Sequence, residues 1–544
     1  MIFGRVKPLD AILATAEKKS LHRTLGAFQL TMLGIGAVIG TGIFVLTSEA
    51  AQKAGPGMMV SFVIAGFVCA VAALCYAELA SMVPVAGSAY TYTYSVVGEL
   101  FAWMVGWALI LEYAVGASAV AVGWSNHAVG LLSASGIHIP SVLSNADALM
   151  AHVQVAFGAP MSADLQTAMQ TGGYVNVPAI LIAGLVTTLL VIGTTESAFV
   201  NAILVAIKIT ALSIFILLTL PALKSGHFSP FMPTGAAGVF GAAASIFFAY
   251  VGFDAVSTAA EETKNPQRNV PIGLIGSLFI CTIFYLLVAA GAIGAFGAQP
   301  VMGPDGHALP PGSAEIAGRC AAIVSGGSVE PLVCSKEALV HVLQVIGHPV
   351  VGWFVGLAAV LALPSVVLMM MYGQTRIFFT MARDGLLPER LSAVHPRFRT
   401  PHVVTIVTGI GTAIAAAFLP VGKLADYSNS GTLFAFLMVA VSVLVLRQVD
   451  PSRTRPFRTP IVWVVAPLSI IGCLVLYGSL PWTAILLLPG WGAIGLLIYF
   501  LYSRSRSHVG RGIVEVPELD PSAPHVAVAP MPGAPAPGEP AERG

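Results

Sequence analysis

The chain has 544 residues, of which 56% are hydrophobic and only 9% are charged. Soluble domains carry about 25% charged residues, so this composition excludes a surface that lies mainly in water. The formal net charge of +1 gives no electrostatic reason to expect a nucleic-acid partner. The sequence therefore predicts that the lipid bilayer is the main environment of this protein.

Twelve apolar segments are long enough, or nearly so, to cross a hydrocarbon core that needs about 20 helical residues. We place them at 29–51, 58–83, 100–129, 174–193, 199–220, 238–260, 272–297, 350–380, 402–419, 424–446, 461–479 and 484–502. The first is too long for the apolar part of a signal peptide, so we expect no cleaved leader. We expect an all-α membrane protein with three parts: a basic segment at 1–28, a twelve-helix domain at 29–503 and a disordered, Pro- and Ala-rich tail at 504–544.

Lys and Arg residues are unequally divided between the two sides of these segments. Nineteen of the 26 lie on the side of the N-terminus, in five stretches: 1–28, 261–271, 381–401, 447–460 and 504–544. Only five lie in the connections on the other side. Because cytoplasmic loops carry the excess of Lys and Arg, we expect a multi-pass protein of the bacterial cytoplasmic (inner) membrane with both termini in the cytoplasm.

Four of the six cysteines fall within predicted spans, where they are expected to be small packing residues: Cys69, Cys75, Cys281 and Cys473. The other two, Cys320 and Cys334, share the outer connection 298–349. We predict a disulfide between them. Because that side of the membrane permits a bridge without requiring one, two free thiols are the alternative. The sequence contains no CxxC or Cys/His metal spacing. We therefore expect no metal and no cofactor.

The first predicted span contains an unusual density of glycine. The stretch Gly34–Phe44 reads GIGAVIGTGIF, with glycines at 34, 36, 40 and 42. Each one costs a helix interior about 0.8–1 kcal/mol relative to alanine. Close helix packing through the GxxxG of Gly36 and Gly40 accounts for two of them, whereas an unwound stretch accounts for all four. We therefore predict a broken helix.

A break in this span would free backbone groups for a ligand. The amides of Gly40, Thr41 and Gly42 would lie at the N-terminus of a half-helix, where partial positive charge suits a carboxylate. On the other side of the break, carbonyls near Ile35 and Val38 would suit an ammonium group.

The sixth span carries a comparable interruption at Phe248, Ala249, Tyr250, Val251 and Gly252. If the first five spans and the next five form two halves, these two breaks lie in corresponding helices. Breaks at matching positions of two halves are the best sequence indication of the central site of a transporter. We predict that the two interrupted stretches together bind the substrate.

Two charged side chains lie deep within other spans. Lys208 is some ten residues into the fifth span, about 15 Å deep, where a lysine costs about 2.5–3.5 kcal/mol. Extension of its stem toward the cytoplasm is the alternative to a coupling role. Glu112, on the third span, could pair with Lys208, titrate by itself or serve as a hydrogen-bonded structural residue. Asp254, just after the second break, is expected to face the protein interior.

Besides the glycine-rich stretch, four further stretches have a distinctive sequence: AGPG at 54–57, YAELASMVPVAGSAYTYTY at 76–94, FFAYVGFDAVSTAAEETKNPQRNVPIG at 247–273 and RDGLLP at 383–388. Together these stretches resemble the amino acid–polyamine–organocation superfamily, and in particular its bacterial cationic amino acid transporter branch. The resemblance runs from about residue 20 to 505.

The resemblance implies the fold of the bacterial leucine transporter, with an inverted repeat of five plus five helices followed by two more helices. It also implies that one set of positions surrounds the amino acid: Val38, Thr41, Gly42, Phe248 and Val251. Lys208 matches the lysine that, in proton-coupled relatives, stands where sodium-coupled relatives hold an ion.

The eighth span offers no acidic residue to a cationic side chain, because 364–371 reads PSVVLMMM. We therefore expect a proton-coupled importer of small or apolar neutral L-amino acids, with an exchanger of cationic amino acids or polyamines as the alternative. An intramembrane enzyme would need a motif such as HExxH or GxSxG, and neither occurs in the sequence. A non-transporting amino acid sensor is also compatible with the sequence.

Overall fold

The computed structural model describes residues 5–8, 25–83, 88–193, 198–258, 260, 263–398 and 400–513. Within these ranges the chain is mostly helical, and the strands are limited to one antiparallel pair, β1 (Ser144–Asn145) and β2 (Val175–Asn176). The prediction of an all-α architecture is confirmed at this level.

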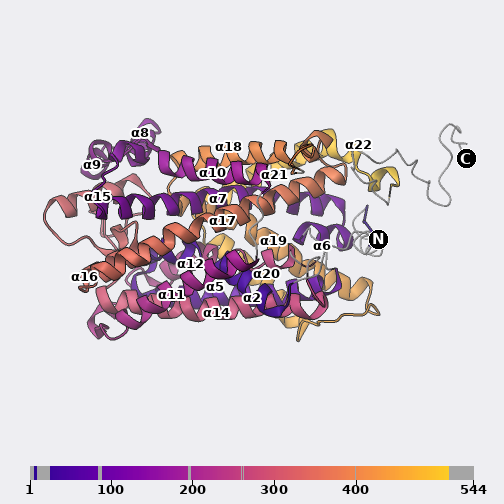
Figure 1. The fold of residues 1–544 in the computed structure, drawn as a ribbon, viewed down its shortest axis with the longest axis horizontal. Coiled ribbons are helices and arrows are strands. Elements are labelled where there is room, and N and C mark those ends of the chain that lie inside the picture. The colour runs from indigo at the N-terminus through magenta and orange to yellow at the C-terminus, as the bar shows by residue number, and fades with distance from the viewer. Residues whose placement is uncertain are drawn as a thin grey trace, which may run out of the picture.

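All twelve predicted apolar segments fall on helices. In chain order these are α2 (Ala27–Val38), α3 (Thr41–Phe44), α4 (Leu46–Ala54), α5 (Met58–Met82), α7 (Glu99–Ala134), α10 (Val177–Ile192), α11 (Ala198–Thr219), α12 (Gly235–Ile246), α13 (Ala255–Thr258), α14 (Pro266–Phe296), α17 (Pro349–Arg383), α18 (His402–Phe418), α19 (Val421–Val449), α20 (Val462–Gly478) and α21 (Trp482–Ile498). Long helices run side by side along the long axis of the molecule (Figure 1).

Seven helical stretches among the described residues are long and apolar enough to cross a membrane: Leu46–Met82, Glu99–Ala134, Val200–Thr219, Pro266–Phe296, Pro349–Arg383, Val421–Val449 and Trp482–Arg506. Five shorter apolar helices accompany them: Ala27–Val38, Val177–Ile192, Gly235–Tyr250, His402–Phe418 and Val462–Gly478. Large apolar side chains such as Leu217, Phe279, Trp482 and Leu497 are more than half exposed on the outside of the bundle. A surface of this kind is stable in lipid and not in water, so this is a membrane protein.

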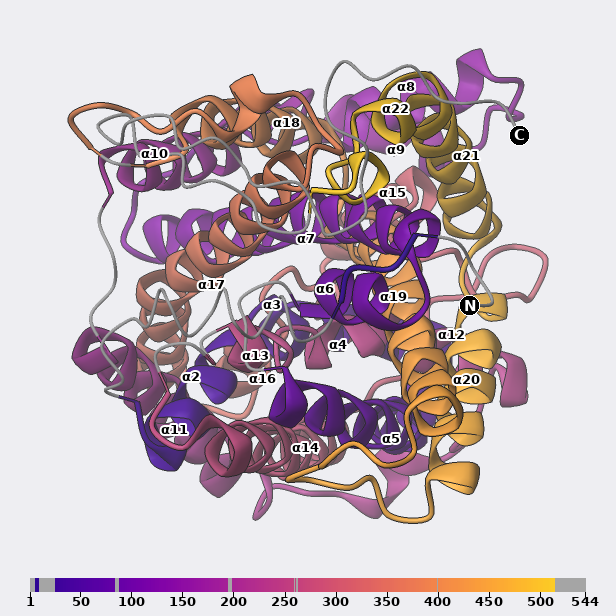
Figure 2. The same ribbon diagram turned by 90° about the vertical axis from the view of Figure 1, so that its right-hand side faces the viewer.

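The interior of the bundle holds the interrupted helices. Seen end-on, α3 and α13 lie near the centre, while α20 and α21 lie at the periphery (Figure 2). The long helix α7 packs against both α17 and α19, and α2 packs against α14 and α11. Continuous helices therefore surround the short helical pieces.

The two long connections between predicted spans, 130–173 and 298–349, form a partly helical cap at one end of the bundle (Figure 1). Its helices are α8 (Asp147–Ala156), α9 (Ala163–Thr171), α15 (Ala314–Ser325) and α16 (Ala338–Val345). Helix α15 packs against α9, so the two connections contact each other although they are far apart in sequence. Short amphipathic helices can form there because each buries an apolar side against its neighbour.

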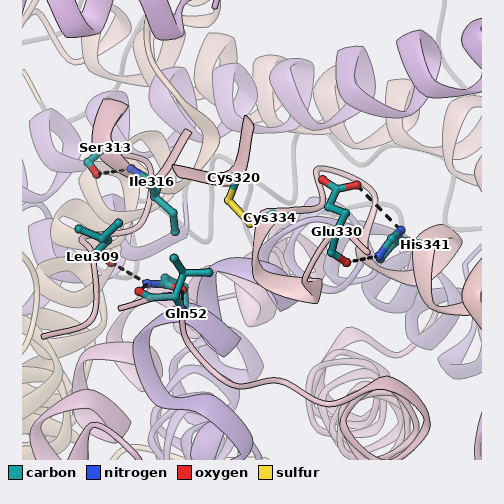
Figure 3. The surroundings of a disulfide bond; sticks show 9 residues. Gln52, Leu309, Ser313, Ile316, Cys320, Glu330, Cys334 and His341 are labelled. Carbon is teal, nitrogen blue, oxygen red and sulfur yellow. Dashed lines mark hydrogen bonds and ion pairs between the residues drawn. A yellow bond between two sulfur atoms is a disulfide. The ribbon is translucent and has the colours of Figure 1, made fainter. Parts of the chain in front are cut away.

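The cap is closed by the predicted disulfide and attached to the bundle by a glutamine. Cys320 and Cys334 are bonded, with a Cα–Cα distance of 5.5 Å (Figure 3). Near them, the Gln52 side chain on α4 donates hydrogen bonds to the carbonyls of Val301, at 2.8 Å, and Leu309, at 2.9 Å. Gln52 also accepts one from the Val301 amide, at 2.8 Å. The cap is therefore joined directly to the helix that follows the first break.

We expect loss of the disulfide to destabilise the cap. Its cysteines are 14 residues apart, and closing a loop of this size contributes about 3 kcal/mol in the chain-entropy model. Replacing both cysteines with serine should lower the thermal midpoint in detergent, and a reductant should lower the midpoint of the wild type but not of the double variant. Rapid modification of both cysteines by a thiol reagent in unreduced protein would contradict the bridge.

Glu337, which precedes α16, should make the stability of the cap depend on pH. Its carboxylate packs against Gly130 of α7. Burial, and secondly the neighbouring Glu330, raise the pKa of Glu337 from 4.5 to about 8. Between these two pKa values the folded protein keeps a proton on Glu337 that the unfolded chain releases. The stability of the folded protein therefore falls as pH rises from about 4.5 to about 8.

We expect the thermal midpoint of the wild type to fall between pH 5 and pH 8. In Glu337→Gln, which cannot ionise, this fall should be smaller. Glu330→Gln should be measured in parallel, because Glu330 contributes to the raised pKa of Glu337. The Glu330 carboxylate also lies 4.0 Å from Nδ1 of His341 (Figure 3). Equal slopes of midpoint against pH in wild type and Glu337→Gln would show that Glu337 does not titrate in this range.

At the end opposite the cap, the Lys- and Arg-rich stretches of the sequence come together. Lys7 forms an ion pair with Asp384 at 2.7 Å. Glu78, at the end of α5, accepts two hydrogen bonds of 2.8 Å from Arg447, and Arg455 lies 3.3 Å from it. The asymmetry of charge in the sequence is therefore an asymmetry between the two ends of the bundle.

Candidate functional site

The first predicted break is present. Helix α2 ends at Val38, and α3 begins at Thr41. Between them Ile39 has an extended conformation, with φ −72° and ψ 96°, and Gly40 is not helical. The amides of Gly40, Thr41 and Gly42 therefore lie at the start of a new helical piece, where the first four amides of a helix have no intrahelical acceptor.

The second predicted break is also present. Helix α12 ends at Ile246, a 3₁₀ turn covers Phe247–Tyr250, and helical structure resumes only at Ala255. Gly252 has a φ of +113°, and a Cβ placed on it would lie 3.0 Å from the carbonyl oxygen of Ala37. Only glycine tolerates both this conformation and this approach, so the sequence requires glycine here.

The two breaks touch each other. Gly252 of the second lies against Ala37 of the first, and a methyl group on Gly42 would overlap the backbone of Ala249. Residues some 200 positions apart in sequence therefore form a single buried centre. This juxtaposition is what the matching positions of the two interruptions predicted.

The interpretation that unwinding explains all four glycines is wrong. Gly34 lies within α2 and faces Ser277 of α14, 2.5 Å from the position of a Cβ. Gly36 faces Asn201 and Val205 of α11, both at 2.8 Å. Gly34, Gly36 and Gly42 thus allow close packing against three different neighbours, because half-helices at the centre of a bundle are surrounded on every side. Gly40 alone lies in the break.

The carbonyls at the end of α2 have specific partners. The Ile35 carbonyl, expected to be free, accepts a hydrogen bond of 2.8 Å from the Ile39 amide. The carbonyl of Gly36 accepts one of 2.7 Å from Nζ of Lys208. Lys208 is 1% exposed, so its side chain does not extend to water. Lys208 therefore lies at the end of α2, close to the first break.

Glu112 is 1% exposed on α7, and its carboxylate lies beside the hydroxyl of Thr432 on α19. Among the described residues Glu112 forms no ion pair with Lys208, so the alternative that these two side chains pair is not borne out. Asp254 is fully buried, as predicted, and accepts a hydrogen bond of 3.0 Å from the hydroxyl of Tyr113.

Two residues beside the breaks were not found from the sequence. The hydroxyl oxygen of Tyr285, on α14, lies 2.8 Å from the carbonyl oxygens of both Val38 and Ala249. Val366, on α17, lies 3.4 Å from the position that a Cβ on Gly40 would take. A single tyrosine or valine in an apolar span is a weak signal, since most such residues only pack.

A cluster of three polar side chains also joins the outer parts of both broken helices. Lys53, assigned from the sequence to an outer connection, lies in the last turn of α4 and pairs with Asp426 of α19 at 3.1 Å. The hydroxyl of Ser245, on α12, contacts both of these side chains. Three helices are thus linked on the side of the cap, by Ser245 directly before the second break and by Lys53 between three and four helical turns after the first.

A cavity of about 570 Å³ lies between the first broken helix and the cap. Val45, Ser48 and Glu49 line it from the side of α4, whereas Asp147 and Lys336 line it from the side of the cap. Because Val45 is five residues after Gly40, the cavity reaches within about two helical turns of the break. It provides space between the cap and the buried centre.

Comparison with known proteins decides the family. The family model described as amino acid permease matches residues 25–493. This chain belongs to the amino acid permease family. It is 43% identical to the branched-chain amino acid permease of Bacillus subtilis over 94% of this chain and 99% of that protein. It is 40% identical to the methylthioribose transporter of the same organism, over 92% of this chain and 98% of that protein.

A vacuolar cationic amino acid transporter of Arabidopsis thaliana is more distant, at 35% identity over 82% of this chain and 64% of that protein. The superfamily resemblance in the sequence is thereby confirmed. This permease is a transporter and not an enzyme, and cationic amino acid transporters are among its distant relatives. Its two broken helices are the structural feature on which the site is built.

Proposed function

We propose that this permease imports small or apolar neutral L-amino acids, driven by an inward proton gradient. The observation that carries the proposal is the contact between the two breaks, with buried Lys208 bonded to one of them at 2.7 Å. The arrangement fits twelve spans with an inverted repeat of five plus five helices, since the breaks fall in the first helix of each half. A branched-chain amino acid permease at 43% identity supports the substrate class.

In this proposal the backbone recognises the groups that all amino acids share. The amides of Gly40, Thr41 and Gly42 bind the α-carboxylate, since a helix N-terminus carries about half a positive charge. The carbonyl of Val38 and the 3₁₀ turn Phe247–Tyr250 face the α-ammonium group. Phe248 and Val251 then lie beside the side chain of the substrate.

The wall opposite the first break favours a neutral side chain. Val366 is the residue of α17 that approaches Gly40, and none of the neighbouring positions of α17, from 364 to 371, carries a charge. The second candidate function, exchange of cationic amino acids or polyamines, is favoured by one observation: the Glu112 carboxylate is buried, and no Lys or Arg side chain of the described residues pairs with it. A cationic side chain that reached Glu112 would satisfy it.

Coupling is proposed to run through Lys208. When protonated, its ammonium group holds the Gly36 carbonyl at the end of α2 and stabilises this conformation of the first broken helix. Loss of the proton weakens that bond and favours the alternative conformation, so proton release and movement of the broken helix are linked. No cofactor takes part.

The orientation follows from charge. The end that gathers Lys7, Arg447 and Arg455 is proposed to face the cytoplasm. The disulfide-bonded cap then lies outside, where thiols are readily oxidised. The cavity beneath the cap becomes the entry path for substrate.

Uptake by purified protein in proteoliposomes tests the proposal. Labelled leucine, alanine and arginine should be offered with and without an inward proton gradient, and leucine should accumulate only with the gradient. The decarboxylated amine of leucine should compete poorly, because it lacks the carboxylate. Accumulation of arginine in exchange for internal arginine would favour the second function, and saturable binding without uptake would indicate a sensor.

A further inference from the structure

Three oxygen atoms at the junction of the two breaks share one hydrogen atom. The hydroxyl oxygen of Tyr285 lies 2.8 Å from the Val38 carbonyl oxygen and 2.8 Å from that of Ala249. A hydroxyl has a single hydrogen, and a carbonyl has none. At any moment, therefore, one of these two close oxygen–oxygen contacts lacks its hydrogen bond.

The surroundings prevent water from supplying the missing donor. Tyr285 is fully buried, and its ring packs against Tyr250, with 5.3 Å between ring centroids, and Phe62, at 5.8 Å. Ala249 is also fully buried, and Val38 is nearly so. A buried acceptor without a donor costs free energy, so this junction attracts a group that carries several hydrogens.

An ammonium group meets this need, because it has three hydrogens for three oxygens. We propose that the hydroxyl oxygen of Tyr285 is the third oxygen of the site for the substrate α-ammonium group, together with the carbonyls of Val38 and Ala249. In the empty protein the Tyr285 hydrogen bridges the two carbonyls in place of the ammonium. This inference rests on the proposed function and adds a side chain to its backbone contacts.

The geometry also separates the two cations of the proposed cycle. Lys208 donates to the carbonyl of Gly36, two residues before Val38. The coupling lysine and the substrate ammonium group therefore have different acceptors on the same end of α2. Substrate at Tyr285 and a proton on Lys208 can be present together, as symport requires.

The test compares leucine with N-methylleucine, which has two N–H hydrogens instead of three. Binding of both is measured to wild type and Tyr285→Phe, which keeps the ring and removes the hydroxyl. We expect the affinity for leucine to fall about tenfold in the variant, as for loss of one hydrogen bond to a charged group. The affinity for N-methylleucine should change little, because two hydrogens still meet two carbonyls.

The matched control is Tyr477→Phe. Tyr477 lies on peripheral α20, and its hydroxyl donates to the Ile485 carbonyl at 2.6 Å, away from both breaks. Both affinities should be unchanged in this variant. If Tyr285→Phe does not fold, a fluorinated tyrosine at position 285, whose hydroxyl oxygen is a weaker acceptor, should selectively weaken leucine binding.

An equal fall in the affinities for leucine and N-methylleucine in Tyr285→Phe would overturn the inference. Loss of a residue that only braces the two helices would weaken both ligands alike, whatever their number of N–H hydrogens. Affinities for both ligands that are the same in Tyr285→Phe as in wild type would overturn it as well. A wild type that binds neither amino acid would instead overturn the proposed function on which the inference rests.

Discussion

Lys208→Ala should abolish accumulation of leucine in response to an inward proton gradient, while exchange of leucine at equal pH is partly retained. The physical reason is that Nζ of Lys208 is the only described side-chain group bonded to the Gly36 carbonyl, at 2.7 Å. Without it, the end of α2 no longer responds to a proton. Counterflow and gradient-driven uptake in the same proteoliposomes measure the two activities separately.

Lys224→Ala is the matched control, because Lys224 is an exposed lysine in the connection that follows α11. Its loss should leave both activities close to wild type. If Lys208 only braces helices α2 and α11, Lys208→Ala should lower the thermal midpoint and weaken leucine binding together. Retained accumulation in a folded Lys208→Ala variant would exclude Lys208 as the proton carrier, and Glu112 would then be tested.

Gly42→Ala should remove leucine binding and destabilise the protein. The added methyl group would overlap the Cα and Cβ of Ala249, and a backbone at the centre of the bundle cannot move aside without separating the two breaks. Overpacking of this kind costs about 1–3 kcal/mol. Leucine binding and the thermal midpoint should therefore both fall, and they can be measured on the same detergent-purified sample.

Gly184→Ala provides the comparison for this change. Gly184 lies in the interior of α10 with nothing within 4 Å of an added Cβ. Because alanine is the better helix former, this variant should be neutral or more stable by up to about 1 kcal/mol. A Gly42→Ala protein that binds leucine as tightly as the Gly184→Ala protein would mean that the contact between the breaks is not needed for binding.

The sequence by itself determined the features that depend on local composition. Apolar length predicts helices in a membrane, and the glycine-rich stretch at 34–44 and the interruption at 248–252 predict the two breaks. The depth of Lys208 within an apolar segment predicts its burial. Each of these follows from a single stretch of chain, because hydropathy, helix propensity and segment length are properties of neighbouring residues.

The tertiary structure alone decided which groups meet. The acceptor of Lys208 is a carbonyl 172 positions away, and Tyr285 lies 247 positions from Val38 and 36 from Ala249. One sequence offers no way to choose such partners, since a residue in an apolar span can face lipid, a neighbouring helix or the centre. The same reason explains the glycines: whether Gly36 unwinds a helix or admits Asn201 depends on where α11 lies, which the packing of the whole bundle sets.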